Sequence, residues 1–261
     1  MSINYNEIDK NIKVNIINQN ISQSKYGLYK SLPLYKPVKI LLSQCDIELY
    51  EINKIPNVFV INKHSLNIVE EINTTDNLPL VVHVVGSEFD GSSLQLCNGL
   101  RDHTFILRTN FNAIVGLDNI FSFDNNECIY TSLLHIIRGI KLNGLTIDNV
   151  IPFSMVIAAP AYKRINVTDY VSSDYFIKTI SIIDTIFKIA IMKKHSILIL
   201  TNFGDNDEDK NSTDDIIKIY NLCILKYGHM FKSIIIAISE YDEELYKYYL
   251  NNIIIPKNLY K

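Results

Sequence analysis

The sequence predicts an α/β domain with a mixed, largely parallel sheet, helices on both sheet faces, and a helical or extended segment added at the N-terminus. From residue 38 onward, short apolar runs rich in Ile, Val and Leu alternate with segments of helical periodicity. Several of these runs are apolar on both sides, as in strands that are covered on both faces. In the C-terminal half, strands and helices alternate with short connections, which implies parallel neighbours joined by right-handed crossovers.

Residues 1–37 are predicted to be the added segment, and residues 38–261 the main domain. The segment is polar with scattered isoleucines, so we expect a helix in it, followed by an extended connection flanked by Pro33 and Pro37. Six apolar runs of the main domain predict strands. They cover residues 38–42, 57–61, 80–85, 154–158, 196–200 and 233–238.

Four segments of the main domain have the apolar spacing of helices. The first follows Ser65, which is expected to cap it, and leaves Glu70 and Glu71 on the solvent side. The other three helices begin near residues 173, 212 and 240. Inside the strand over residues 80–85, His83 is expected to be a core histidine with a satisfied ring.

The composition excludes several classes of protein. With 48% hydrophobic and 20% charged residues, the 261-residue chain can form a packed core, and a net charge of -3 argues against a nucleic-acid-binding protein. No signal peptide or membrane-spanning run is visible, so a cytoplasmic protein without a membrane partner is predicted. The four cysteines lack metal-ligand spacing, and Asp205, Asp207 and Asp209 lack the turn glycine and final glutamate of a calcium loop. We therefore predict no metal and no cofactor.

Two glycine-containing loops follow predicted strands, over residues 86–93 and 201–209. In open α/β sheets, ligands bind beyond the carboxyl ends of the strands, and glycine lets backbone N–H groups approach an anion closely. These loops are therefore the candidate ligand site. Acidic residues lie in both of them, which disfavours a diphosphate there.

Residues 57–93 resemble the opening of the microbial-type poly(ADP-ribose) glycohydrolase (PARG) domain, a branch of the macrodomains. Asn62-Lys-His-Ser-Leu66 stands where that family has an N-E-D-T-L-like turn, and Gly91-Ser92-Ser93 stands where it has a P-G-G-G loop. Arg101-Asp102-His103 occupies the place of the family's Q-E-E triplet.

The resemblance continues downstream and covers residues 57 to 250. Segments 128–138 and 155–161 are similar to the family's Y-S-P…V-F-R and V-I-T-x-P-A-P segments, and Gly204 stands in the second glycine loop. The resemblance implies a macrodomain-like fold with ADP-ribose in the crevice and its diphosphate on the glycine loops. It also implies that the second glutamate of the triplet protonates the leaving oxygen of a ribose–ribose bond while water attacks the anomeric carbon.

This sequence departs from that pattern at the reactive positions. His103 stands in place of the catalytic glutamate: a histidinium would repel an oxocarbenium-like transition state, and a neutral imidazole stabilises it less than a carboxylate does. Asp102 keeps a carboxylate, but it is shorter and one residue away. Both are family-equivalent catalytic positions that we expect to be inactive, and a helix start is the alternative role for the pair.

The ligand-binding residues implied by the resemblance are His64, Gly91, Ser92, Ser93, Arg101 and Gly204. His64 is expected either to stack on a base or to cap the following helix. Arg108 and Arg138 are candidates for a diphosphate or a partner carboxylate, with surface salt bridges as the default expectation.

The predicted function is a catalytically degenerate PARG-like macrodomain, a pseudoenzyme that binds an ADP-ribose-like nucleotide or a protein partner. Two alternatives stay open: an active, divergent ADP-ribosyl glycohydrolase that uses Asp102 or His103, and a structural or interaction protein, of viral origin for example, without nucleotide binding. Fold resemblance does not transmit activity, and the altered positions favour the degenerate macrodomain and the interaction protein together over the active hydrolase.

Overall fold

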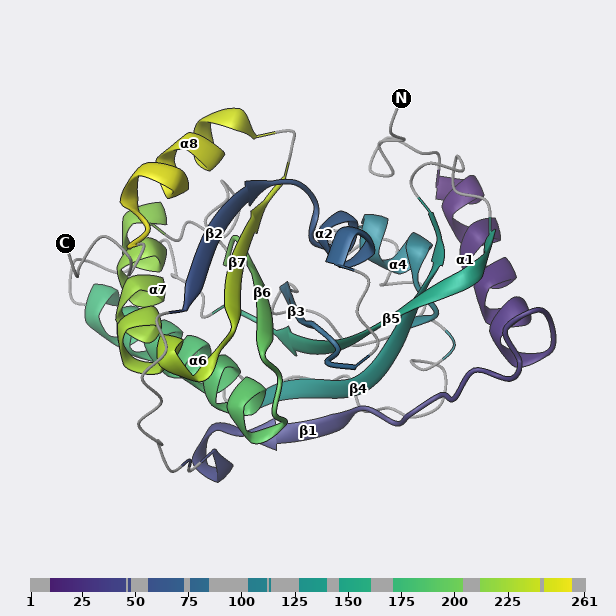
Figure 1. Cartoon of the computed structure of the whole chain (residues 1–261), viewed down its shortest axis with the longest axis horizontal. Coiled ribbons are helices and arrows are strands. Elements are labelled where there is room, and N and C mark those ends of the chain that lie inside the picture. The colour runs from purple at the N-terminus through teal and green to yellow at the C-terminus, as the bar shows by residue number, and fades with distance from the viewer. Residues whose placement is uncertain are drawn as a thin grey trace.

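Figure 1 shows the computed structural model of the chain, in which helices pack on a seven-stranded sheet. The structure describes residues 10–45, 47, 56–72, 76–84, 103–111, 113, 127–139, 146–160, 171–203, 212–239 and 242–254. The strands are β1 (Val38–Leu41), β2 (Asn57–Asn62), β3 (Leu80–Val84), β4 (Glu127–Arg138), β5 (Thr146–Ala158), β6 (Ile197–Thr201) and β7 (Ser233–Ile238). The α-helices are α1 (Lys10–Lys25), α2 (Ser65–Ile72), α4 (His103–Arg108), α6 (Val171–Met192), α7 (Thr213–Tyr227) and α8 (Glu243–Asn252).

The strand order is β1-β4-β5-β3-β6-β7-β2. Neighbours from β5 to β2 run parallel, whereas β1 with β4 and β4 with β5 are antiparallel. The prediction of a mixed, largely parallel sheet is therefore confirmed. All six predicted strands are present, and each boundary except one lies within about a residue of the prediction, as expected where apolar runs are bounded by turn residues.

The exception is β5, which begins at Thr146 and pairs over its length with β4, a strand that the apolar pattern did not predict. Pro152 lies inside β5, and proline in a run argues against a central strand. Here Pro152 lies opposite His135, between two irregularities of the β4–β5 register. Register shifts of this kind bend a strand pair, and the long pair curves away from the sheet toward α1 (Figure 1).

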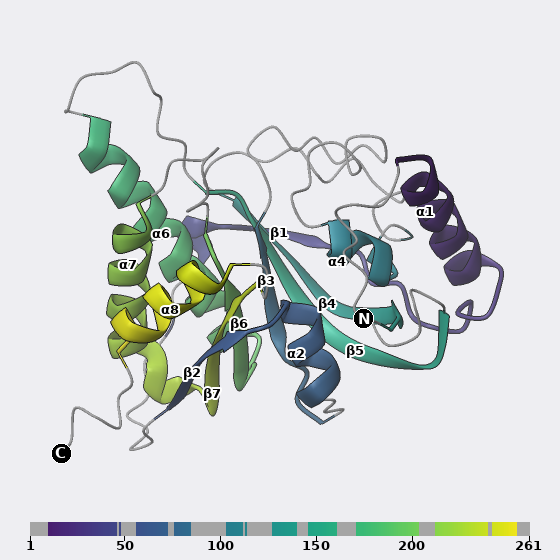
Figure 2. The ribbon, with the colours of Figure 1, turned by 90° about the horizontal axis from the view of Figure 1, so that it is seen from above.

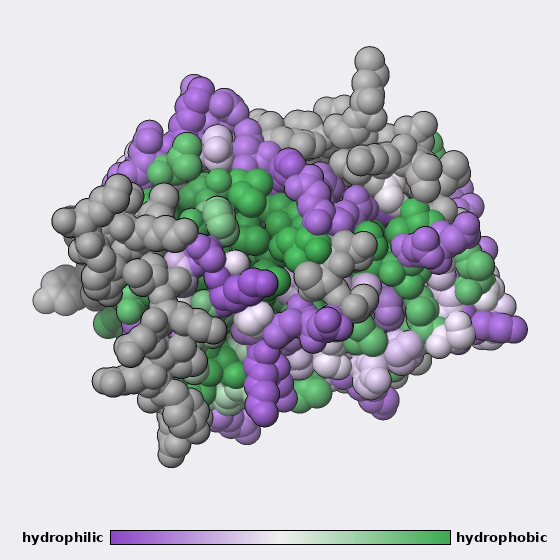
Figure 3. All heavy atoms as spheres, viewed as in Figure 1, coloured by the Kyte–Doolittle hydropathy of each residue, from purple (hydrophilic) through white to green (hydrophobic). Residues whose placement is uncertain are grey.

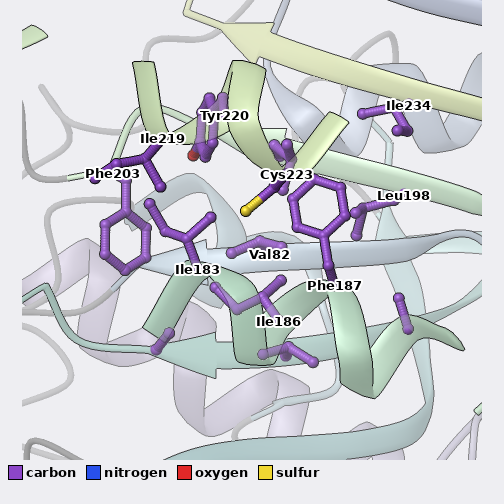
Figure 4. Packing of buried hydrophobic residues seen from close by; sticks show 14 of the residues in the cluster. Val82, Ile183, Ile186, Phe187, Leu198, Phe203, Ile219, Tyr220, Cys223 and Ile234 are labelled. Atoms are coloured by element: carbon purple, nitrogen blue, oxygen red, sulfur yellow. The ribbon is translucent and has the colours of Figure 1, made fainter. Parts of the chain in front are cut away.

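Two hydrophobic clusters lie on opposite faces of the sheet, because side chains alternate along each strand. One contains residues of α6, α7 and α8, among them the buried Phe187, Tyr220 and Cys223 shown in Figure 4. The other contains residues of α2, α4 and α1, including Phe105. Figure 2 shows the two groups of helices on either side of the sheet, which confirms the prediction of helices on both faces.

The expected N-terminal helix is α1, and it contributes to the second cluster through Ile17. After α1, the Tyr29 hydroxyl donates to the carbonyls of Ile137 (3.2 Å) and Ile147 (2.6 Å), so this segment joins the far end of the β4–β5 pair. None of the helices that the structure describes combines the length and apolar character needed to cross a bilayer.

Candidate functional site

The topology predicts a ligand crevice at the carboxyl end of β3. The chain that leaves β3 leads to α4, whose side chains join the cluster of α1 and α2. The chain that leaves the neighbouring β6 leads to α7, which belongs to the opposite cluster. In open α/β sheets, such a reversal between adjacent strands leaves a crevice where ligands bind. The two predicted glycine loops follow these two strands in the sequence.

Most of the predicted site residues lie outside the part of the chain that the structure describes. These are Gly91, Ser92, Ser93, Arg101, Asp102 and Gly204. His103 is the first residue of α4, the position that the helix-start interpretation gives to it. Their proposed roles in ligand binding and catalysis therefore stay predictions. The described residues beside these positions show which contacts hold β3, β6 and α4, the elements around the expected crevice.

The end of β6 is fixed by contacts on both sides. The Tyr220 hydroxyl of α7 donates to the Thr201 carbonyl at 2.5 Å, and the Thr201 hydroxyl donates to the Val82 carbonyl of β3 at 3.4 Å. Phe203, two residues beyond Thr201, is fully buried in the cluster of α6 and α7. The segment that carries Gly204 therefore leaves from a tightly held point.

On the other wall, an aromatic contact joins β3 to α4. The His83 ring lies 4.3 Å from the Phe105 ring at an interplanar angle of 22°, a stacked arrangement. His83 is only 4% exposed, which confirms that it is a core residue, but its buried Nε2 has no hydrogen-bond partner among the described residues, so the expectation of a satisfied ring is wrong for this nitrogen. Stacking of this kind contributes about 0.5–1.5 kcal/mol beyond area burial and fixes how α4 lies over the end of β3.

Arg108 holds the other end of α4, and here the default expectation of a surface salt bridge is wrong. Its side chain is fully buried and donates through Nε to the Arg138 carbonyl at 3.0 Å and through a terminal nitrogen to Asn67 Oδ1 at 2.6 Å. The other terminal nitrogen pairs with the Glu70 carboxylate. The planar, forked guanidinium satisfies three acceptors at once, which is why arginine can be buried here.

Glu70 consequently does not point to solvent as the helical pattern predicted. Its side chain is 19% exposed and turns inward to Arg108, whereas Glu71 is 61% exposed and pairs with Lys63 at 2.6 Å. The helical spacing of α2 is correct, but its polar face overlaps the edge of its buried face. Glu70 lies at the border between the two faces, and the ion pair with the buried Arg108 makes the inward position of its carboxylate favourable.

Arg138 is buried as well, which also corrects the surface default. Its Nε donates to Asn20 Oδ1 of α1 at 2.7 Å, and a terminal nitrogen donates to Gln19 Oε1 at 3.1 Å. Asn20 in turn donates to the Leu107 carbonyl at the end of α4 at 3.0 Å. One polar network therefore joins α1, α2, α4 and β4 behind the crevice, and both arginines are used in it.

His64 caps α2. Its Nδ1 accepts the backbone N–H of Leu66 at 3.2 Å, and its carbonyl accepts the N–H groups of Asn67 and Ile68. The cap residue is thus His64, one position before the predicted Ser65, which is the first residue of the helix and buried. Of the two roles considered for His64, the structure places it in the cap, and stacking on a base stays a prediction.

A shallow cleft of about 480 Å³ lies where α7 and α8 begin, beyond the carboxyl ends of β6 and β7. It is lined by Ser212, Thr213, Asp214, Asp242, Glu244, Leu245 and Tyr248. The Tyr248 hydroxyl donates to Asp214, and this hydrogen bond raises the pKa of Tyr248. Three carboxylates make the cleft unfavourable for an anion, so its chemistry does not match that of a phosphate subsite.

Two histidines are buried away from the crevice. Burial lowers the pKa of His135 to about 4, and burial also lowers the pKa of His195, whose Nε2 lies 2.9 Å from the Tyr130 hydroxyl. Both rings are neutral at pH 7 and hydrogen-bonded within the core, so the two histidines have a structural role. Among the described residues, no group of three or more His, Cys, Asp or Glu is placed to hold a metal ion.

No protein-family model and no curated protein matches the sequence. Solved structures, however, match the fold over most of its length. PARG from Thermomonospora curvata superimposes with a TM-score of 0.67 at 8% identity, over 94% of this chain and 97% of that one. The same enzyme bound to the inhibitor ADP-HPD gives 0.66 at 9% identity, over 92% and 99%. PARG from Deinococcus radiodurans in complex with ADP-ribose gives 0.59 at 9%, over 76% and 84%.

These similarities establish that the chain has the microbial PARG-type fold, as its motif resemblance implied. The coverage includes nearly the whole chain and nearly the whole of the Thermomonospora curvata enzyme. At 8–9% identity the agreement concerns the fold, since fold and activity are separable. The functional question therefore rests on the residues at the carboxyl ends of β3 and β6.

Proposed function

We propose that this protein binds ADP-ribose or a closely related nucleotide in the crevice at the carboxyl ends of β3 and β6, and that it does not hydrolyse ribose–ribose bonds. The observation that carries the proposal is the similarity of almost the whole chain to PARG structures, including one with ADP-ribose and one with ADP-HPD. The reversal of the connections that follow β3 and β6 supports a ligand at the same edge of the sheet.

The proposed loss of hydrolysis rests on residues 101–103. Where the PARG resemblance implies Gln-Glu-Glu, this chain has Arg101, Asp102 and His103. Glycoside cleavage needs a carboxylic acid near the leaving oxygen and a site that tolerates developing positive charge. Arg101 adds a fixed positive charge to that site, and a misplacement of the acid by about 1 Å costs on the order of a hundredfold in rate.

Arg101 also supports binding, because a guanidinium can donate two hydrogen bonds to a phosphate. Glu88 and Asp90, in the first glycine loop, oppose it by repelling the diphosphate. We therefore propose weak binding, in which these neighbouring charges set the affinity.

Isothermal titration of the full chain with ADP-ribose tests the binding. We expect a measurable dissociation constant for the wild type. It should become smaller in the Glu88→Gln/Asp90→Asn variant. In Arg101→Ala it should become larger by on the order of tenfold, because one charge-assisted hydrogen bond is lost. Glu71→Gln, a change of the same type at an exposed residue of α2, is the matched control and should leave the affinity unchanged. Absence of heat at millimolar ADP-ribose would contradict the proposal and favour an interaction protein.

A hydrolysis assay tests the second half. Incubation with poly(ADP-ribose) is expected to release no ADP-ribose above the uncatalysed rate. Release that disappears in the Asp102→Ala/His103→Ala double variant would instead establish the divergent hydrolase.

A further inference from the structure

The strand β2 ends the sheet and leaves half of its backbone groups unused by the sheet. Its only strand neighbour among the described residues is β7. The Asn57 N–H donates to the Lys232 carbonyl before β7, so the backbone groups of Asn57, Phe59 and Ile61 point toward β7. Because the direction alternates along a strand, those of Val58, Val60 and Asn62 point outward. A row of outward N–H and C=O groups is a template for another strand.

Edge strands are usually protected by charged residues, proline or short length. The opposite edge follows this rule: β1 has four residues and carries Lys39, which pairs with Glu127 at 3.1 Å. The six residues of β2 (Asn-Val-Phe-Val-Ile-Asn) include no charge, although a proline precedes each of the two strands and Lys63 follows β2. The two edges of one sheet therefore differ in the features that prevent strand addition.

The surface around β2 is apolar. Phe59 is 47% exposed, and its neighbours Val60 and Ile61 are only half-buried. In the view of Figures 1 and 3, β2 runs across the front of the molecule, and hydrophobic surface covers the corresponding area of the space-filling picture. An exposed phenylalanine on an open sheet edge is what an added strand would cover.

The charges at the two ends of β2 identify the partner. Lys232 is exposed where β2 begins, and where it ends the first turn of α8 has Asp242, Glu243 and Glu244. Asn62 Nδ2 lies 2.8 Å from Glu243 Oε2, so these carboxylates directly adjoin the strand end. Two lysines also lie at this end, Lys63 paired with Glu71 and Lys247 paired with Glu243, but the carboxylates outnumber them. Among the described residues, the start of the edge is thus basic and its end is acidic overall. An antiparallel second copy brings each basic start toward an acidic end, whereas a parallel copy would oppose like charges.

We propose that two copies of this chain associate through β2 as an antiparallel pair, which makes one continuous sheet. Outward-pointing groups must meet outward-pointing groups, and a register with the two-fold axis between the two Val60 residues satisfies this condition. In that register Val58 lies opposite Asn62 of the second copy. Phe59 then lies beside Ile61 of the second copy on one face. On the other face, Lys232 is directed toward Glu243 of the second copy. Such a contact is isologous, as closed two-fold dimers require.

Sedimentation velocity and light scattering of the full chain test the proposal. The wild type is expected at twice the 30.0 kDa of one chain at tens of micromolar. Phe59→Lys should raise the dimer dissociation constant at least about tenfold, because the two-fold axis introduces the charge twice beside apolar residues. Leu222→Lys, at a leucine 55% exposed on α7, is the matched control and should leave the dimer intact.

A charge exchange gives a test that does not depend on the core. Lys232→Glu alone and Glu243→Lys alone should each weaken the dimer, and the double variant should restore it, since both residues are exposed. A wild type that stays monomeric at 100 micromolar overturns the proposal, as does a Phe59→Lys variant that is still dimeric. Binding of a different protein to β2 of a monomer would identify the edge as a site for that protein and would equally refute self-association.

Discussion

The buried Arg108 gives the sharpest test of how the wall of the crevice is held. Arg108→Met replaces the guanidinium by an apolar side chain that can occupy part of the same space. The change removes the donor that now serves the Arg138 carbonyl, Asn67 Oδ1 and the Glu70 carboxylate. We expect the protein to fold but with much lower stability, because the acceptors stay in place while their common donor is lost.

The magnitude follows from burial. Removing one partner of a buried ion pair costs about 3–5 kcal/mol, because an uncompensated charge is left behind. The Glu70 side chain is 19% exposed and can be hydrated, so the free-energy cost of leaving its carboxylate unpaired is smaller than for a fully buried carboxylate. Three acceptors lose a donor at once, which keeps the expected loss in the same range, about 3–5 kcal/mol. In a domain whose total stability is about 5–15 kcal/mol, that is a large fraction.

Urea denaturation at pH 7, followed by circular dichroism, measures this loss as a shift in the midpoint, and thermal unfolding should show a decrease in Tm on the order of 10 °C. Glu70→Gln keeps an acceptor and should cost less than Arg108→Met. Lys63→Met breaks the exposed pair with Glu71 and should cost about 1 kcal/mol or less. If the loss of stability in Arg108→Met lies within about 1 kcal/mol of the loss in Lys63→Met, the network does not hold α4 and the reasoning fails.

Three further predictions concern the same fold. Burial lowers the pKa of His135 to about 4, so as pH decreases the unfolded chain binds the proton before the folded chain does. The free energy of unfolding should therefore fall as pH decreases from 6.5 toward 4. Urea midpoints across that range should fall less in His135→Gln than in the control His229→Gln. Asn20→Ala removes the link from α1 to α4 and should cost about 1–3 kcal/mol, with faster hydrogen exchange in α1. Burial raises the pKa of Asp184, but its hydrogen bonds, of which that from Tyr227 has the largest effect, outweigh burial and lower the pKa overall. Denaturation curves should therefore show that Asp184→Asn destabilises the protein more at pH 7 than at pH 3.

The central strands of the fold could be predicted because local and tertiary preferences agree there. The runs that became β3, β6 and β7 consist mostly of Val, Ile and Leu, and in the structure they are covered on both faces. The helices α6 and α7 likewise have apolar residues at helical spacing that face the sheet. In such segments the sequence pattern alone determines both the element and the side that is buried.

The β4–β5 pair could not be predicted in the same way, because its stability comes from pairing between distant segments. Thr131, Ser132 and His135 interrupt the apolar pattern of β4, and Pro152 interrupts that of β5. Tertiary contacts bond the backbone of two of these residues: the Ser154 hydroxyl donates to the Ser132 carbonyl at 2.7 Å, and Asn110 Oδ1 accepts the His135 N–H at 2.9 Å. Neither contact has a local sequence signal.

Buried charge explains the misjudged residues of the site. Arg108 and Glu70 are 38 residues apart, and single charged residues in amphipathic patterns are normally exposed. Only the approach of α2 to α4 makes an inward glutamate favourable. The catalytic prediction was of another kind, since it came from motif resemblance. The PARG-type fold agrees with that resemblance, and the roles of residues 101–103 stay predictions.

The placement of the polar network has a consequence for that chemistry. Arg108, which holds α4, is at the carboxyl end of the helix, whereas positions 101–103 lie at or before its amino end. Among the described residues, α4 is positioned by the bond from Arg108 to the Arg138 carbonyl, the bond from Asn20 to the Leu107 carbonyl and the stacking of Phe105 on His83. None of these three contacts is made by a side chain at positions 101–103, so a change of residue there leaves them in place. Stability and reactivity are separable in this architecture, which is the physical reason why nucleotide binding without hydrolysis is the function that we propose.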